Sequence, residues 1–398
     1  MKYSNLLQNL GTETAFAVSA QAKEWASQGN KVYPFHLGDI NLPTPENIVE
    51  ATVKSIKDGY TGYCPSEGIF PLREALANDV GVKRGVDYDP DNVAVQPGGK
   101  PTIGKFISSI LDPGDEILYP NPGYPIYESQ IEYQGGRAIP YSYHQTKSGF
   151  DIDIEKLKDS VSDNTVAIIY NNYQNPMSAE SSEKEMQDIA QIAIENDLWV
   201  LSDEAYFEII YEGNAKSIVS IPGMKERTVI LYTFSKKFAM TGWRVGGSIG
   251  PKEIISRIAK FNVNAESCTT HFIQNAMVEA LNGDQAGSLE ILKILKERRD
   301  VAVEGLNAID GIDILTPRTT FYLFPNVTNV MKRKNIQRVE ELQNGALKQA
   351  NVSFCTRDHF GRAQDNEAES YIRLAYSGIS TEDITEGLNA LKNYFEYK

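Results

Sequence analysis

The fold is decided by a pattern that is clearest in LWVLSDEAY (residues 198–206) and TVILYTFSK (residues 228–236). Each stretch begins with a run of apolar and β-branched residues and ends in polar or charged side chains. Runs of this composition are typical of strands buried on both faces, as in a largely parallel sheet. Since ligands of such sheets bind at the carboxyl ends of the strands, we expect Asp203 and Lys236 to face a ligand.

The same pattern recurs earlier in the chain, with helical segments between several of the runs. The runs and the polar clusters after them are NVAVQ–PGGK (92–100), EILYP–NPGYP (116–125) and TVAIIY–NNYQNP (165–176). A further run, VGGSIG (245–250), has no such polar cluster. Alternating strands and helices favour an α/β architecture with a mostly parallel central sheet flanked by helices.

The length of the chain predicts two domains. Its 398 residues, of which 41% are hydrophobic, exceed what one compact core usually holds. After residue 285 the pattern changes to a long helix, expected over 286–308, and then to the strand-like runs FYLF and YIRLAY. We therefore predict a large domain over residues 45–285 and a smaller α+β domain over 286–398, with residues 1–44 packed against the smaller one.

The composition limits the classes of partner. A net charge of −14, from 39 basic and 53 acidic residues, argues against nucleic acid and anionic membranes. The chain has no run of about 18 apolar residues, and its beginning lacks the apolar segment of a secretory signal. We expect a cytoplasmic protein without a metal, whose ligands are small molecules. The cysteines and histidines lack disulfide and metal-ligand spacing: Cys64, Cys268, Cys355, His36, His144, His271 and His359.

The polar residues after the strands suit a phosphate group. Thr233 and Ser235 offer hydroxyls, and Arg244 can bind phosphate through two parallel hydrogen bonds. The stretch PGGKPT (97–102) joins a strand to a helix, whose first N–H groups attract anions. An ATP-binding loop is a poor alternative, because Lys100 is followed by proline and the glycine spacing differs. A dinucleotide fingerprint is also missing after the first strand.

Taken in order, SDEAY (202–206), TFSK (233–236) and GWR (242–244) resemble the class I and II aminotransferases, which are fold-type I enzymes of pyridoxal 5'-phosphate. The resemblance extends from Gly38 to Arg373 and is closest to the aspartate-aminotransferase-like branch. It implies a homodimeric transferase that moves an amino group between an amino acid and a 2-oxo acid such as 2-oxoglutarate.

The resemblance assigns roles around the cofactor ring. Lys236 would bind the cofactor aldehyde as a Schiff base and then carry the proton that moves during the reaction. The family pattern and the spacing to the arginine favour it over its neighbour Lys237. Asp203 would keep the pyridine nitrogen protonated, so that the ring withdraws electrons. The remaining ring contacts would come from Tyr206 and Asn175, at the phenolate oxygen, and from Tyr124, stacked on the ring face.

Further roles concern the phosphate and the substrate. Arg373 would bind the substrate α-carboxylate, with Gly38 and Asn175 beside it. Tyr63 resembles the family tyrosine that reaches the phosphate of the neighbouring subunit, so the resemblance implies a homodimer with shared sites. The implied phosphate ligands within one chain are Thr233, Ser235, Arg244, and the backbone of Gly99 and Lys100.

Three departures from the family pattern bear on specificity. In aspartate-preferring relatives, a lysine at the place of Lys100 lies near the distal carboxylate of acidic substrates, which predicts aspartate or glutamate as the donor. Here Pro101 follows that lysine where glutamine is usual. The usual NPTG is Asn175-Pro176-Met177-Ser178 in this chain, and Arg357 stands where a glycine is expected. Whether Lys100 or Arg357 contacts a distal carboxylate stays open at this point.

Two other functions use the same scaffold. A pyridoxal-phosphate-dependent C–S β-lyase or synthase would share every cofactor residue and would release pyruvate from its substrate. A ligand sensor with an aminotransferase-like domain would carry a DNA-binding segment, for which the early start of the family pattern leaves no room. We do not expect a direct role for His36 or His359, although both fall in segments near the cleft.

Overall fold

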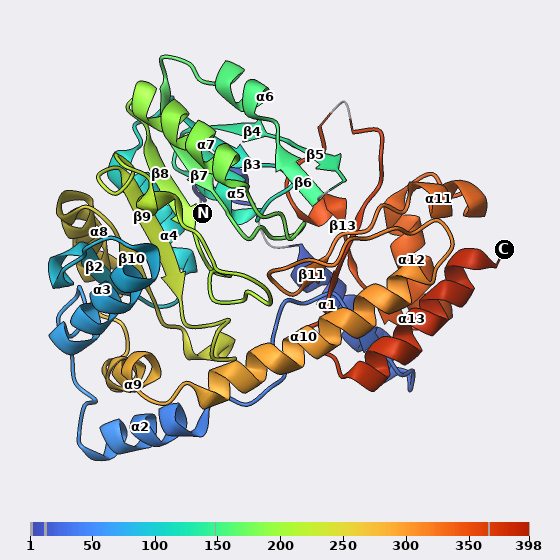
Figure 1. Ribbon diagram of the computed structural model, residues 1–398, viewed down its shortest axis with the longest axis horizontal. Coiled ribbons are helices and arrows are strands. Elements are labelled where there is room, and N and C mark those ends of the chain that lie inside the picture. The colour runs from blue at the N-terminus through green and yellow to red at the C-terminus, as the bar shows by residue number, and fades with distance from the viewer. Residues whose placement is uncertain (1–2, 12–13, 148, 365–366, 398) are drawn as a thin grey trace.

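The protein is described here by a computed structural model that covers residues 3–11, 14–147, 149–364 and 367–397. Figure 1 shows two parts side by side: a sheet with helices packed around it, and a smaller group of helices and short strands. The helix α10 (Ala286–Asn307) runs from the first part into the second.

The central sheet has seven strands in the order β2-β10-β9-β8-β7-β3-β4. Every neighbouring pair is parallel except the two that involve β10. The predicted fold class, with a mostly parallel central sheet flanked by helices, is therefore confirmed. The strands are β2 (Val93–Gln96), β3 (Glu116–Pro120), β4 (Arg137–Tyr141), β7 (Thr165–Tyr170), β8 (Trp199–Asp203), β9 (Thr228–Thr233) and β10 (Gly246–Ile249).

The direction of β10 sets VGGSIG apart from the other runs. Because β10 is antiparallel to β9 and β2, its carboxyl end lies at the opposite edge of the sheet. Lys252 and Glu253, which follow it, therefore lie away from the polar clusters that end the parallel strands.

Helices cover both faces of the sheet. Val229 and Leu231 of β9 pack toward α4, α5 and α8, while the alternate residues Ile230 and Tyr232 pack toward α3 and α9. Both faces are apolar, as expected of a buried parallel sheet. The helices are α2 (Glu46–Lys57), α3 (Phe70–Arg84), α4 (Lys100–Ile110), α5 (Ile126–Tyr133), α6 (Ile154–Asp159), α7 (Glu183–Glu195), α8 (Lys252–Ala265) and α9 (His271–Asn282); a hairpin is formed by β5 (Tyr143–Thr146) and β6 (Gly149–Ile152).

Local sequence signals fix several helix ends. Ser182 and Glu185 form a reciprocal capping box at the start of α7, which satisfies N–H groups that the helix leaves open. The α3 helix has Pro71 in its first turn and ends at Gly85, whose φ of 67° is left-handed and favours glycine.

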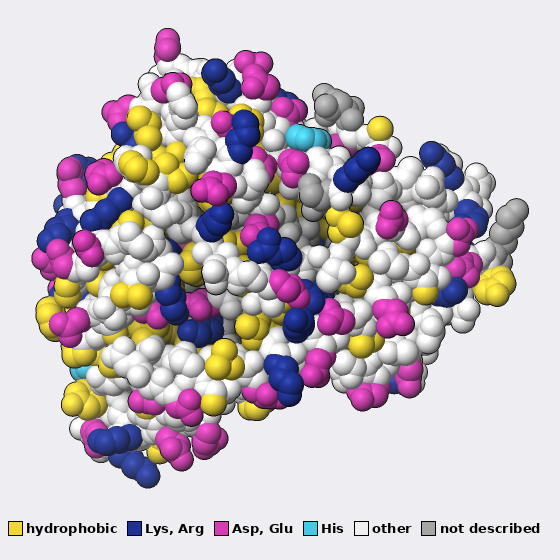
Figure 2. All heavy atoms as spheres, in the orientation of Figure 1, with side chains coloured by type: hydrophobic (Ala, Val, Ile, Leu, Met, Phe, Trp, Pro, Cys, Tyr) yellow, Lys and Arg dark blue, Asp and Glu magenta, His cyan; other side chains and the backbone are white. Residues whose placement is uncertain are grey.

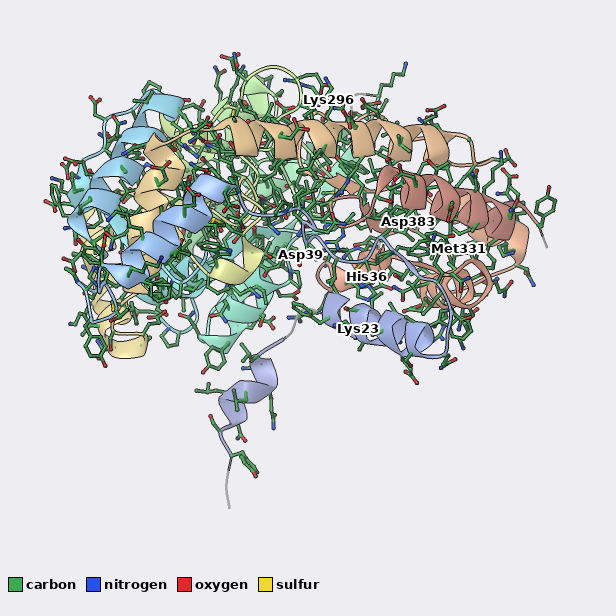
Figure 3. The ribbon with its side chains drawn as sticks, turned by 90° about the horizontal axis from the view of Figure 1, so that it is seen from below. Lys23, His36, Asp39, Lys296, Met331 and Asp383 are labelled. Atoms are coloured by element: carbon green, nitrogen blue, oxygen red, sulfur yellow. The ribbon has the colours of Figure 1, made fainter. Side chains whose placement is uncertain are left out.

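The second part is built from both ends of the chain. The β1 strand pairs in parallel with β12, and the Trp25 indole donates to Asn351 Oδ1 at 2.8 Å. Figure 3 shows His36 and Asp39 between the helix that carries Lys23, α1, and the helix that carries Lys296, α10. The domain boundaries after residues 44 and 285 stay predictions. The elements are α1 (Ala15–Ser27), β1 (Tyr33–Pro34), β11 (Tyr322–Leu323), α11 (Thr328–Lys334), α12 (Val339–Ala350), β12 (Val352–Ser353), β13 (Cys355–Thr356), β14 (Ile372–Ala375) and α13 (Thr381–Glu396).

The surface charge and the length of the helices bear on the kinds of partner that the protein can have. Acidic and basic side chains are mixed over the face shown in Figure 2. Among the helices of the described residues, none has both the length and the apolar character required to cross a bilayer.

A buried ion pair joins α3 to the carboxyl edge of the sheet. The Arg84 Nε donates to Glu204 Oε2 at 2.6 Å, and the two side chains are 0% and 2% exposed. Ser202 donates to the other carboxylate oxygen at 3.0 Å, and the Arg84 guanidinium lies 3.7 Å from the centre of the Phe207 ring. The pair therefore fixes the segment that contains SDEAY.

Replacing Arg84 by methionine should lower the free energy of unfolding by about 3–5 kcal/mol, because Glu204 would stay buried without its cation. Urea unfolding followed by circular dichroism measures the change. Lys184→Met, which removes an exposed pair with Asp188, serves as the control and should leave the midpoint nearly unchanged. Equal midpoints for both variants would contradict the assigned role of the buried pair.

Candidate active site

A cavity of about 690 Å³ opens at the carboxyl edge of the sheet, where the two parts of the molecule meet. Its walls come from the ends of β8 and β9, the start of α4, and the segments around residues 38 and 360. All predicted site residues except Tyr63 line it: Gly38, Gly99, Lys100, Tyr124, Asn175, Asp203, Tyr206, Thr233, Ser235, Lys236, Arg244 and Arg373.

Of the two neighbouring lysines, only Lys236 lines the cavity. Its Nζ donates to the Gly38 carbonyl at 2.8 Å and lies 5.8 Å from the centre of the Tyr206 ring. Lys237 turns away toward Glu208, at 3.7 Å. Burial lowers the pKa of Lys237. An amine at the place of Lys236 can both form a covalent bond to a carbonyl ligand and carry a proton.

Asp203 is a buried carboxylate at the end of β8. The Tyr127 hydroxyl donates to Oδ2 at 2.6 Å, and the Ala205 N–H donates to Oδ1 at 3.1 Å. Burial raises the pKa of Asp203 although both hydrogen bonds favour the anion. A buried carboxylate of this kind suits a cationic partner such as a protonated ring nitrogen.

Two tyrosine hydroxyls meet on another wall. Tyr206 and Tyr322 lie 2.6 Å apart, oxygen to oxygen, and burial raises the pKa of Tyr206 well above its usual value. The Tyr206 hydroxyl is therefore neutral at physiological pH. A Cβ on Gly38 would lie 2.1 Å from the Tyr322 hydroxyl, so only glycine fits there.

The opposite end of the cavity suits a phosphate. Thr233 Oγ1 lies 2.9 Å from Ser235 Oγ, and α4 begins at Lys100 with open N–H groups. Gly98 has a φ of 98°, and a Cβ there would come within 2.1 Å of Arg244 Nη2. The glycine therefore makes room for the guanidinium beside this anion site.

Arg373 is held in place but keeps donors available. Its Nη1 donates to Asn175 Oδ1 at 3.1 Å, and its Nη2 donates to the His36 carbonyl at 2.5 Å. Its Nε is buried without a hydrogen-bond partner among the described residues. A guanidinium that is held in this way can bind a carboxylate through two parallel hydrogen bonds.

The structure separates the two cations considered for specificity. Lys100 lines the cavity, with its Nζ 5.7 Å from the centre of the Tyr124 ring. Arg357 lies outside the cavity lining and is 3% exposed. Its guanidinium donates to both carboxylate oxygens of Glu367, at 2.5 Å each, and to Asn121 Oδ1 at 2.6 Å. Arg357 is therefore engaged within the protein.

Tyr63 lies apart from the cavity of its own chain. Its side chain is 89% exposed, in the loop before α3. Its predicted contact with the cofactor of a neighbouring subunit stays a prediction.

Several cavity residues were missed by sequence reasoning. Tyr127, Tyr322 and Asn171 all line the cavity. Tyr127 lies one helical turn after Tyr124, so the spacing could have revealed it. Tyr322 lies 116 positions from its partner Tyr206, and no local signal joins the two. Among the described residues, no group of acidic, cysteine or histidine side chains could hold a metal ion.

Comparisons with known proteins show the family of the chain. The profile of the family "Aminotransferase class I and II" matches residues 31–391. The aspartate aminotransferase of Bacillus sp. (strain YM-2) is 32% identical over 94% of each chain.

Solved structures agree as well. The aspartate aminotransferase of Thermus thermophilus with maleate superposes with a TM-score of 0.91 at 28% identity, over 99% of this chain and 100% of that one. The alanine aminotransferase of Pyrococcus furiosus gives 0.90 at 28% identity, over 100% of each chain. The family match spans most of the sequence, and the chain belongs to the class I and II aminotransferases.

Proposed function

We propose that this aminotransferase takes an acidic amino donor, aspartate or glutamate, and 2-oxoglutarate as acceptor. The observation that carries the proposal is the cavity itself, which is lined by Lys236, Asp203, Arg373 and Lys100. Enzymes of this family depend on pyridoxal 5'-phosphate. When bound, the cofactor supplies an aldehyde and a ring that withdraws electrons from the reacting carbon.

The residues of the cavity fit the cofactor. Asp203 would pair with the protonated ring nitrogen, which is the kind of cationic partner that stabilises a buried carboxylate. Tyr206 and Asn175 would donate to the phenolate oxygen, and Tyr124 would stack on the ring. We assign the phosphate to Thr233, Ser235, Arg244, and the backbone at Gly99 and Lys100.

Lys236 would move the proton. Its Nζ lies 2.8 Å from the Gly38 carbonyl, beside the predicted substrate site. A neutral amine at Nζ would remove a proton from the substrate Cα and later return it elsewhere on the reacting system. The buried position of Tyr206 and Tyr322 limits the access of water to this point.

Arg373 would bind the substrate α-carboxylate. Its side chain lines the cavity, and its contacts with Asn175 and the His36 carbonyl fix the direction of the guanidinium. A fixed guanidinium loses little freedom on binding and so orients the Cα toward Lys236.

Lys100 supports an acidic donor. Its side chain lines the cavity, and a distal carboxylate of the donor would gain a charge-assisted hydrogen bond from the ammonium group. The relative from Bacillus sp. is named an aspartate aminotransferase, whereas a fold neighbour is named an alanine aminotransferase. The donor therefore has to be measured.

A homodimer would complete the site. The exposed Tyr63 side chain is available to a second copy of the chain, in which it would reach the phosphate. We also place the enzyme in the cytoplasm, which the three free cysteines support, because thiols stay reduced there.

Replacing Lys236 by alanine should lower transamination by more than about a hundredfold, because the variant loses the amine proposed to bind the cofactor and to carry the proton. Turnover of glutamate with a 2-oxo acid measures this, and peptide mapping after borohydride reduction should find the cofactor on Lys236 of the wild type. Lys237→Met is the control and should stay active, since Glu208 keeps Lys83 as its partner. A label on Lys237 would contradict the assignment.

Lys100→Met should lower kcat/KM for aspartate and glutamate by about 10–100-fold and leave alanine nearly unchanged, because only the acidic donors lose a charged hydrogen bond. Single-turnover spectra with each donor measure the rates. Wild-type enzyme that reacts fastest with alanine or an aromatic donor would refute the acidic preference. Release of pyruvate from cysteine conjugates would instead indicate the β-lyase activity.

Mixing two defective variants tests the shared site. Tyr63→Ala alone should lower kcat/KM about tenfold. When Lys236→Ala and Tyr63→Ala subunits are unfolded and refolded together, about a quarter of the sites should be native, because each mixed dimer has one intact site. Lys236→Ala with Arg373→Ala is the control and should recover nothing, since both residues act in one chain. Equal recovery in both mixtures would argue against a shared site.

A further inference from the structure

His359 forms part of the cavity wall contributed by the smaller part of the molecule. It is the last residue of the 3-10 turn η5 (Arg357–His359) and lines the cavity together with Phe360. The Phe360 ring lies 4.7 Å from the guanidinium carbon of Arg373. His359 therefore lies next to the wall that borders the proposed α-carboxylate site.

The surroundings of His359 determine which ring nitrogen carries the proton. The Thr356 N–H donates to Nδ1 at 3.1 Å, and the Thr356 hydroxyl lies 2.9 Å from the same nitrogen. The Thr356 carbonyl lies farther from Nδ1, at 3.3 Å, and because a backbone N–H can only donate, the shorter contact makes Nδ1 an acceptor and places the proton of the neutral ring on Nε2. Burial lowers the pKa of His359, which favours this neutral form.

The Nε2–H group is not used within the chain. His359 forms hydrogen bonds through Nδ1 only, and Nε2 has no hydrogen-bond partner among the described residues. The ring is half-buried and lines the cavity. A donor of this kind, fixed on one side and open on the other, suits a ligand acceptor.

Arg357 and its partners make the turn rigid. Arg357 Nη2 donates to Asn121 Oδ1 at 2.6 Å, and the Phe360 carbonyl accepts from the Gly123 N–H at 3.0 Å. Asn121 and Gly123 belong to the loop that carries Tyr124. The turn of His359 is thus tied to the loop on which the cofactor ring would rest, so the position of Nε2 is set relative to the substrate.

We infer that His359 is a specificity-determining residue, which donates a hydrogen bond from Nε2 to an oxygen acceptor on the side chain of the amino donor. The inference rests on the proposed aminotransferase site and deepens it. A site built to donate a hydrogen bond discriminates against substrates that lack the acceptor, because its buried donor stays unpaired. The favoured substrates carry a side-chain carboxylate or amide, and aliphatic donors are disfavoured.

A purely structural role has a different signature. If His359 only capped the turn through Nδ1, its loss would disturb the wall and lower the rate for every donor alike. Two substitutions separate the roles. Asparagine can keep an acceptor near the place of Nδ1 but lacks the Nε2 donor, whereas glutamine can supply a donor near the place of Nε2 but loses the cap.

The experiment measures kcat/KM of the dimeric holoenzyme for glutamate, glutamine, alanine and leucine. His359→Asn should lower the values for glutamate and glutamine by about 10–100-fold relative to alanine and leucine. His359→Gln should retain most of the discrimination. Arg362→Ala, which removes an exposed side chain of the same segment, is the control and should keep all ratios.

An unchanged glutamate-to-alanine ratio in His359→Asn would overturn the inference, whichever donor the wild type prefers. The same decrease for all donors would also overturn it and leave only the capping role. If the wild type does not prefer acidic donors but His359→Asn still reacts selectively worse with glutamate and glutamine, the acidic preference fails and the role of His359 stands.

Discussion

The parallel pairing of β7, β8 and β9 is the constraint on which the active site depends. Tyr170 pairs with Ser202, and Asp203 pairs with Leu231, so the residues that follow all three strands emerge at one edge of the sheet. There Asn171 Nδ2 donates to the Asp203 carbonyl at 3.0 Å, and Asn171 Oδ1 accepts from the Asn175 N–H at 3.2 Å. The loop that carries Asn175 is thereby held to the strand that carries Asp203.

Several charged side chains are buried at this edge, and two acidic ones are paired with cations outside the cavity lining. Glu204 follows Asp203 directly, and Arg84 neutralises it at 2.6 Å. Glu208 lies within 3.7 Å of Lys237, which draws that lysine away from the cavity. Both hydrogen bonds to the Asp203 carboxylate come from neutral donors, so this buried carboxylate suits a cationic ligand.

The sequence was sufficient for the parts of the fold that local patterns determine. Buried strands, polar strand ends and helix 286–308 follow from periodicity and composition, and all but one of the site residues that the ordered motifs predicted line the cavity. It was not sufficient where contacts join distant positions. The hydrogen bond between Tyr127 and Asp203 spans 76 positions and that between Tyr206 and Tyr322 spans 116. In the sequence these tyrosines cannot be distinguished from core residues, because only the folded chain brings each of them to its partner.

Arg357 is a second case in which the sequence did not reveal the contacts of a side chain. Arg357 stands where the family pattern has a glycine, and a cation near the pocket is easily assigned to a carboxylate. It was therefore a candidate for direct contact with the substrate. Its guanidinium is instead satisfied by Glu367 and Asn121. The Arg357 side chain is 4% exposed and that of Glu367 is 29% exposed, so burial of the arginine costs desolvation and the pair is better suited to fixing a geometry than to adding stability. The pair fixes the turn that contains His359, which is the one residue of that turn that lines the cavity. Arg357 would therefore influence specificity although it does not contact the substrate.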